Sequence, residues 1–187
     1  KHLQKVLDVN IEIGDQQAIA KATGNLGLAH KELNELETAL TYFNKMLDLA
    51  GKIGDQHTVA NAYSSIGLIY KHQGSYNKAI AFFKKNRAIM EKLKMTAGLM
   101  NTYANMAEIY VDMGKLKEAR KYFDSSMEIS HEQSDRHTES MLLERIAEID
   151  YYENKVQESL DKIIIASKIF EEVENLTELF RCEQLNI

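Results

Sequence analysis

The sequence predicts an all-α fold, an α-solenoid of antiparallel helix pairs, and three observations favour this class. The 187-residue chain has no proline and only nine glycines, so few of its residues would break or weaken a helix. The tetrapeptide Ile-Gly-Asp-Gln stands at residues 13–16 and again at 53–56, which indicates a repeat of 40 residues. Inside each repeat, apolar residues recur at three- and four-residue spacings, as in amphipathic helices.

The repeat extends well beyond this tetrapeptide. Residues 25–30, Asn-Leu-Gly-Leu-Ala-His, align with residues 65–70, Ser-Ile-Gly-Leu-Ile-Tyr, and further copies start at residues 105 and 145. Twelve residues after the glycine or alanine of each segment comes a second small residue, and a large apolar residue follows four positions later. These pairs are Ala39/Phe43, Ala79/Phe83, Ala119/Phe123 and Ser159/Ile163.

Each copy is predicted to contain two helices. In the second copy, Tyr63, Ile66, Gly67 and Tyr70 fall on one helical face, and the segment from Tyr76 to Phe83 shows the same periodicity. Between the two helices we expect a left-handed residue, which glycine and asparagine favour. Before the first helix of a copy, an aspartate can cap the free N–H groups. The expected turn residues are Asn34, Gly74, Gly114 and Asn154, and the expected caps are Asp15, Asp55 and Asp135.

The small residues at Gly27, Gly67, Ala107 and Ala147 allow the two helices of a copy to approach closely. The large apolar residue of the second helix is expected to fill the space that the first helix leaves. The elements in chain order are the second helix of a truncated preceding repeat (1–12), four repeats (13–52, 53–92, 93–132 and 133–172), and the first helix of a truncated following repeat (173–187). The sequence thus predicts a piece of a longer array, whose ends could self-associate.

The spacing L-G-x2-Y followed by A-x3-F resembles the tetratricopeptide repeat, most clearly in Ile66-Gly67-x2-Tyr70 and Ala79-x3-Phe83. The resemblance implies a right-handed superhelix. The 40-residue period, against the common 34, is similar to the long-repeat type of kinesin light chain, cell-polarity adaptors, and bacterial peptide-sensing and signalling arrays. The proline that usually ends a repeat is missing, which separates this chain from the 34-residue chaperone-binding type.

The resemblance also implies that the first helices line a concave groove that binds an extended peptide or a partner segment. Asparagine suits this task because its amide is both a donor and an acceptor, and can pair with both groups of a peptide backbone. A polar, solvated helix face is the alternative explanation of the same residues. The expected groove residues are Lys21, Asn25, Asn61, Ser65, Leu68, Lys71, Asn101, Asn105, Glu108, Asp112, Arg145 and Glu148.

The charge of this predicted groove changes along the chain. Lys21 and Lys71 make its first half basic, whereas Glu108, Asp112 and Glu148 make its second half acidic. This pattern predicts a ligand with one acidic and one basic end, or two different ligands. Ordinary surface charge would give the same pattern.

Composition and motifs argue against several other functions. The net charge of −5 disfavours nucleic-acid binding, and the longest aliphatic run, residues 163–166, is far too short for a membrane helix. The single cysteine, Cys182, leaves no internal disulfide, which is typical of a cytoplasmic protein. The stretch from His131 to His137 lacks the spacing of a zinc site, and no catalytic motif occurs, so we expect no metal, no cofactor and no enzymatic activity.

Three functions are compatible with these features. The chain is a passive adaptor that binds a protein segment, the peptide-sensing part of a bacterial signalling protein or transcription regulator, or a scaffold that assembles with itself.

Overall fold

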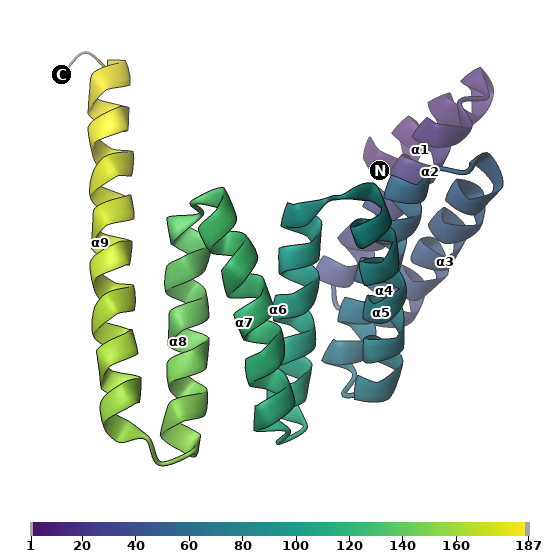
Figure 1. The fold of residues 1–187 in the computed structure, drawn as a ribbon. Helices are drawn as coiled ribbons and strands as arrows, with labels where there is room; N and C mark the ends of the chain where they lie inside the picture. Colours follow the sequence, from purple (N-terminus) through teal and green to yellow (C-terminus); the bar gives the residue numbers. More distant parts are fainter. Residues whose placement is uncertain (1, 186–187) are drawn as a thin grey trace. The chain divides into compact units, whose positions relative to one another are not determined.

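The structure, a computed structural model, describes the backbone of residues 2–185 and the side chains of residues 2–174. Every regular element in this range is an α-helix, and short turns join consecutive helices (Figure 1). The predicted all-α fold is therefore confirmed. The elements are α1 (His2–Ile13), α2 (Gln16–Glu32), α3 (Leu36–Ile53), α4 (Gln56–His72), α5 (Tyr76–Leu93), α6 (Thr96–Asp112), α7 (Leu116–Gln133), α8 (Arg136–Tyr152) and α9 (Val156–Leu185).

The chain divides into two compact units, residues 1–95 and residues 96–187. In unit 1, α2 pairs with α3 and α4 pairs with α5, and the two pairs are stacked through α3 and α4. In unit 2, α6 pairs with α7 and α8 pairs with α9, and α7 packs on α8. Each unit is therefore a short stack of helix pairs, the arrangement of an α-solenoid.

The aspartates before α2, α4 and α8 cap these helices as predicted. Their side chains accept hydrogen bonds from the backbone N–H groups of Ala18, Thr58 and Thr138 at 3.0–3.1 Å. Hydrogen bonds from the Thr58 side chain and backbone lower the pKa of the Asp55 carboxyl, and those from Thr138 do the same for Asp135. The caps therefore stabilise the helices while the carboxyls are ionised.

The turn inside each helix pair contains a left-handed residue, as predicted: Asn34, Gly74, Gly114 and Asn154 all have φ between 59° and 69°. The turns between consecutive pairs also contain a left-handed residue. Gly14 and Gly54 supply it in the first two, but Lys94 (φ 55°) and Ser134 (φ 54°) occupy this position in the next two. The Gly-Asp motif is therefore only one of two ways in which this chain makes the same turn.

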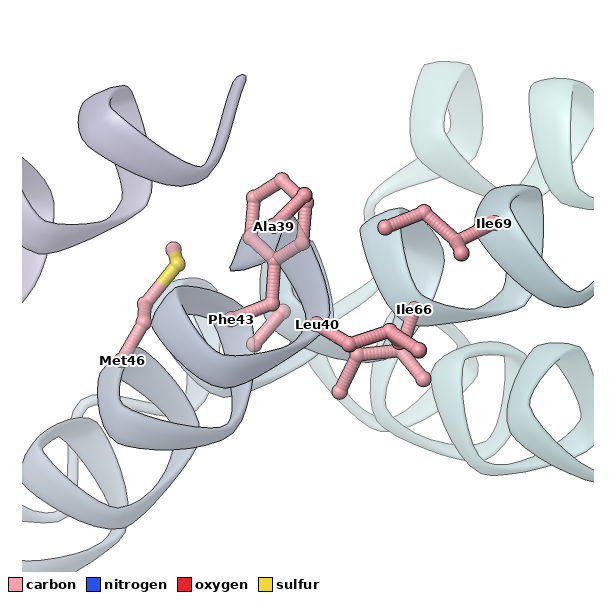
Figure 2. Close-up of a cluster of buried hydrophobic side chains, with 7 residues drawn as sticks. Ala39, Leu40, Phe43, Met46, Ile66 and Ile69 are labelled. Carbon is pink, nitrogen blue, oxygen red and sulfur yellow. The ribbon is translucent and has the colours of Figure 1, made fainter. Parts of the chain in front are cut away.

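A core cluster of unit 1 forms between α3 and α4 (Figure 2). Phe43 is 1% exposed and packs with Leu40, Ile66 and Ile69. A Cβ atom on Gly27 of α2 would lie 2.8 Å from the ring of Phe43. The predicted pairing of a small residue with a large one is therefore confirmed here, and Gly27 serves packing. In the fourth copy it is not, because Ile163 is 45% exposed. Unit 2 repeats this core with Ala107, Ala119, Phe123, Leu142, Ile146 and Ile149.

A second contact joins the helices of the first three pairs through stacked rings. Tyr70 stacks on Phe82 and Tyr110 on Tyr122, with centroids 5.5 Å and 5.4 Å apart. His30 stacks on Tyr42 at 5.1 Å, so His30 serves the packing of the first pair. In the fourth pair the equivalent residues are Asp150 and Lys162, which form an ion pair of 2.7 Å.

The largest departure from the predicted elements concerns residues 173–187. The sequence predicts a helix boundary near residue 172, whereas α9 continues without a turn from Val156 to Leu185. The physical reason is local, because in the 40-residue register Glu174 stands in the place of the turn glycines Gly14 and Gly54, and glutamate does not favour the left-handed conformation of that turn. The remainder of the predicted helix, including Cys182, lies outside the residues whose side chains are described.

Candidate functional site

Unit 1 contains a groove of about 390 Å³ between the first helices of its two pairs, α2 and α4. The floor of the groove consists of Phe43 and Met46 of α3, the second helix of the first pair. The polar walls belong to α2 and α4. The wall residues are Lys21, Gly24, Asn25 and Leu28 of α2, and Thr58, Asn61, Ser64 and Ser65 of α4.

Unit 2 contains a groove of about 440 Å³ between α6 and α8, with Phe123 of α7 on its floor. This groove occupies the same place in the repeat, 80 residues further along the chain. Its other lining residues are Asn101, Ala104 and Glu108 of α6, and Thr138, Met141, Leu142, Glu144, Arg145 and Glu148 of α8.

The two grooves have the same scaffold but a different chemistry. Phenylalanine and threonine recur at equivalent positions, because these residues build the helix pair and the helix cap. The residues that face the open space differ. From the unit 1 groove to the unit 2 groove, the equivalent residues are Lys21 and Asn101, Leu28 and Glu108, Asn61 and Met141, Ser64 and Glu144, and Ser65 and Arg145.

Three of the four predicted asparagines present amides that are available to a ligand. Within the described part of the chain, the side chains of Asn25, Asn61 and Asn101 are exposed, and no hydrogen bond to them is formed. Asn105 differs, because its Nδ2 donates a 2.8 Å hydrogen bond to the carbonyl of Asn101 in its own helix. Its amide donor is thus already engaged by the helix.

Ion pairs organise the wall of the unit 2 groove. Arg145 lies between two carboxylates, with its Nε 4.0 Å from Glu108 and its Nη1 3.4 Å from Glu148. The hydroxyl of Tyr152 also donates to Glu148, at 3.4 Å. Glu144 is exposed and forms no ion pair with the described residues. The lining therefore carries three carboxylates against one guanidinium, whereas Lys21 is the only charged residue that lines the unit 1 groove.

The structure brings eight of the twelve predicted site residues to the two grooves. Leu68, Lys71, Asn105 and Asp112 do not line either one. The prediction placed the whole site on first helices, and so missed the floor residues Phe43, Met46 and Phe123. The A-x3-F spacing that identifies each pair could have indicated the two phenylalanines.

No group of histidine, cysteine, aspartate and glutamate side chains able to hold a metal ion occurs among the described residues. In the same part of the chain, no helix is both long enough and apolar enough to cross a membrane. The grooves are open troughs with apolar floors and polar walls, a shape that suits an extended peptide.

The fold matches several solved structures, each at low sequence identity, so these likenesses concern the fold alone. The structure of BtubC (BKLC) from P. vanneervenii has a TM-score of 0.78 and 14% identity, and the match covers 86% of this chain and 66% of that one. A Rap protein complexed with competence and sporulation factor has a TM-score of 0.74 and 16% identity, over 88% of this chain and 47% of that one.

A third similar structure is a signal transduction ATPase with numerous domains and a tetratricopeptide repeat sensor, from Pyrococcus horikoshii. It has a TM-score of 0.79 and 18% identity, and the match covers 88% of this chain and 26% of that one. The chain therefore spans less than half the length of the Rap protein and of this ATPase.

No curated protein sequence matches this chain. A family model does match it: the tetratricopeptide repeat model fits residues 19–92 and 58–130, which together make up more than half of the chain. The repeat pattern, the stacked helix pairs and this match agree, and the chain belongs to the tetratricopeptide repeat family.

Proposed function

We propose that this chain is a protein-interaction module that holds an extended peptide or partner segment in the grooves of its two units. The observation that carries the proposal is the set of exposed amides on the groove walls, Asn25 and Asn61 in unit 1 and Asn101 in unit 2. A side-chain amide can donate to a peptide carbonyl and accept from a peptide N–H at once. Backbone pairing of this kind holds a chain without dictating its sequence.

Sequence selection would come from the charged walls. Lys21 favours an acidic or neutral group in the unit 1 groove, whereas Glu108, Glu144 and Glu148 favour a basic side chain in the unit 2 groove. The apolar floors accept the aliphatic or aromatic part of such side chains. Recognition needs no bond making or breaking, and we propose no catalytic step.

A second candidate is a sensory role, in which peptide binding changes the conformation of the repeat array and an attached domain responds. The likeness to a Rap protein complexed with competence and sporulation factor and to an ATPase with a tetratricopeptide repeat sensor supports this candidate. An adaptor and a sensor would bind peptide through the same groove residues. They differ in whether binding changes the structure, which small-angle scattering with and without peptide would measure.

Alanine substitution of the three available asparagines is expected to abolish peptide binding while the fold persists. A random peptide library is selected against the chain, and the affinity of each enriched peptide is measured by fluorescence anisotropy. Each asparagine that pairs with a backbone contributes roughly 1–2 kcal/mol, so each substitution should weaken binding about tenfold. The triple variant Asn25→Ala, Asn61→Ala and Asn101→Ala should then lose detectable binding.

The matched control is Asn105→Ala, because the Asn105 amide already donates to its own helix. This variant should bind the selected peptides within about threefold of the parent, since no backbone pair is removed. Peptides that bind the triple variant as tightly as the parent would contradict the proposed site. Failure to enrich any peptide would contradict the proposed function itself.

Charge reversal in the unit 2 groove is expected to weaken the binding of basic peptides selectively. The double variant Glu108→Lys and Glu148→Lys should lower their affinity by about tenfold or more, and should remove much of its dependence on salt. Glu128→Lys with Glu132→Lys makes the same change in net charge on exposed positions of α7 outside the groove. An equal loss of affinity in this control would show that only net charge matters.

A further inference from the structure

The unit 1 groove contains an apolar subsite, defined here as Leu28 and Met46. Both side chains line this groove. Leu28 stands on its wall and is 43% exposed, whereas Met46 lies on its floor and is 7% exposed. The residues 80 positions later in the repeat register are Glu108 and Ser126, which are both polar. The unit 1 groove is therefore apolar at two positions that are polar in unit 2.

Met46 reaches this place because residue 24 of α2 is a glycine. A Cβ atom on Gly24 would lie 2.6 Å from the sulfur of Met46 and 3.2 Å from its methyl carbon, so any side chain there would displace the end of Met46. Leu28 stands four residues after Gly24 and therefore on the same face of α2. The thioether of Met46 and the side chain of Leu28 thus meet the groove at neighbouring places.

The second and third helix pairs use the position of Met46 for a hydrogen bond. Nδ2 of Asn86 donates to the carbonyl of Ala60 at 2.7 Å, and the hydroxyl of Ser126 donates to the carbonyl of Met100 at 3.0 Å. Each of these bonds joins the two helices of a pair. Met46 has no N–H or O–H group, so the first pair cannot form the equivalent bond.

The first pair thus lacks two stabilising features, because it also places a glycine inside α2, where glycine weakens a helix. Core packing explains Met46 only in part, although Met46 belongs to the same cluster as Phe43. The equivalent residues Asn86, Ser126 and Ala166 are shorter and at most 1% exposed, so the other pairs are closed at this position. What Met46 adds is a flexible, polarisable thioether on the floor of a groove.

We propose that this apolar subsite binds one large apolar side chain of the peptide, a leucine, methionine or phenylalanine, here called the anchor. This inference rests on the proposed function, and it names the class of peptide that the unit 1 groove takes. Asn25 and Asn61 line the same groove, so a peptide whose backbone they hold lies over the subsite. The anchor removes apolar surface of Leu28 and Met46 from water, and the flexible thioether fits side chains of different shape.

The test uses the peptide that the parent chain enriches most strongly from the random library. Each of its positions is replaced by alanine in turn, and the affinity of the labelled peptides is measured by fluorescence anisotropy. Replacement of the anchor should weaken binding to the parent chain about tenfold or more, because it leaves Leu28 exposed to water.

Leu28→Glu, which introduces the residue of the unit 2 groove, should remove the preference for the anchor. This variant should bind the peptide with the anchor and the peptide with alanine equally, within about twofold. Leu33→Glu is the matched control, because Leu33 is 69% exposed just after α2 and lines neither groove. The control should keep the preference of the parent chain.

A second variant separates recognition of the anchor from stability. Gly24→Ser with Met46→Asn introduces the residues of the second pair, and residue 46 can then donate to a backbone carbonyl of α2, as Asn86 does to Ala60 in α4. This variant should be at least as stable as the parent chain to urea. Its preference for the anchor should nevertheless fall to about threefold or less, because the apolar floor is gone.

The methyl group of Met46 gives a direct readout of the contact. The chain is isotope-labelled at its methionine methyl groups, and the nuclear magnetic resonance signal of Met46 is assigned from the Met46→Leu variant. The peptide with the anchor should shift this signal, and the peptide with alanine should shift it less. Met90 is the internal control, because it is 5% exposed and lines neither groove.

Failure of this proposal and failure of the proposed function are distinguishable. No enriched peptide, or peptides that bind the triple asparagine variant as tightly as the parent, would contradict the groove site itself. Enriched peptides that depend on the asparagines but have no anchor, or an anchor that Leu28→Glu and Leu33→Glu affect equally, would overturn the apolar subsite alone. A Met46 signal that the peptide does not shift, or a less stable Gly24→Ser and Met46→Asn variant that keeps the preference, would mean that Met46 serves packing only.

Discussion

Replacing Arg120 by leucine is expected to lower the free energy of unfolding by about 3 kcal/mol or more, in the range for breaking a buried ion pair. The Asp150 side chain is 1% exposed, and its two carboxylate oxygens contact different cations. Nη2 of Arg120 lies 2.5 Å from Oδ1, and Nζ of Lys162 lies 2.7 Å from Oδ2. Without Arg120 the buried carboxylate keeps only the contact with Lys162, and leucine cannot donate a hydrogen bond to it.

The stability of this ionic cluster depends on pH in a definite direction. Burial alone would raise the pKa of the Asp150 carboxyl, but Lys162 and Arg120 outweigh burial and hold this pKa below its ordinary value. A carboxyl with a lowered pKa contributes stability above the unfolded-state pKa of about 4, and that contribution is lost as pH falls through the folded-state pKa. Thermal unfolding from pH 7 to pH 3 should therefore show a steeper acid loss in the parent than in a variant without the cluster.

The sequence of an earlier repeat indicates how to design a variant without the ionic cluster. The residues 80 positions earlier that correspond to Arg120, Asp150 and Lys162 are Leu40, Tyr70 and Phe82, which form an apolar contact with a stacked ring pair. The triple variant Arg120→Leu, Asp150→Tyr and Lys162→Phe should recover the stability that Arg120→Leu loses, because a well-packed apolar set can replace a buried ion cluster at little cost. Urea unfolding of the single and triple variants measures this directly.

A matched comparison is Arg136→Leu, because Arg136 pairs with Glu139 and Glu172 at an exposed position. It should change the free energy of unfolding by less than about 1 kcal/mol, as exposed ion pairs do. If Arg120→Leu were equally mild, Asp150 would not depend on its cations. If the triple variant were as unstable as Arg120→Leu, the fourth pair would need its charges for a reason other than packing.

The fold was predictable because single residues mark the helix ends and the packing contacts of each repeat. Asp55 caps a helix, Gly74 ends one, and Gly27 faces Phe43, and each of these features can be seen in the spacing of single residues. Repetition then confirms the pattern, since four copies show the same spacing. The left-handed Lys94 and Ser134 show the limit, because a tight turn can impose this conformation on residues that do not favour it.

The grooves were predictable only in part. Family resemblance assigns the first helices to the wall, but the floor belongs to second helices. Wall and floor residues are 12 to 25 positions apart in the sequence and meet only in three dimensions. The ionic cluster on Asp150 was not visible for the same reason, because its cations lie 12 and 30 positions away. The engaged amide of Asn105 depends on a side-chain rotamer, which spacing does not encode.

Replacing Phe43 by alanine is expected to cost about 3–5 kcal/mol of unfolding free energy, as for other buried phenylalanines. The ring is 1% exposed, fills the space beside Gly27 and contacts α4, so its removal leaves a cavity between three helices (Figure 2). The exposed Phe170 is the matched control, since Phe170→Ala removes the same ring at 49% exposure and should cost less than about 1 kcal/mol. Guanidinium unfolding compares the two variants.

A double-mutant cycle shows whether Gly27 and Phe43 act as one packing unit. Gly27→Ala alone should destabilise by about 1–2 kcal/mol, because its Cβ would lie 2.8 Å from the Phe43 ring. Combined with Phe43→Leu, the same change should become neutral or favourable, since alanine is the better helix former by about 1 kcal/mol. Gly51→Ala, which meets no atom within 4 Å, should be favourable by itself. If the two changes in the free energy of unfolding were additive, the glycine at position 27 would not be required to accommodate the Phe43 ring.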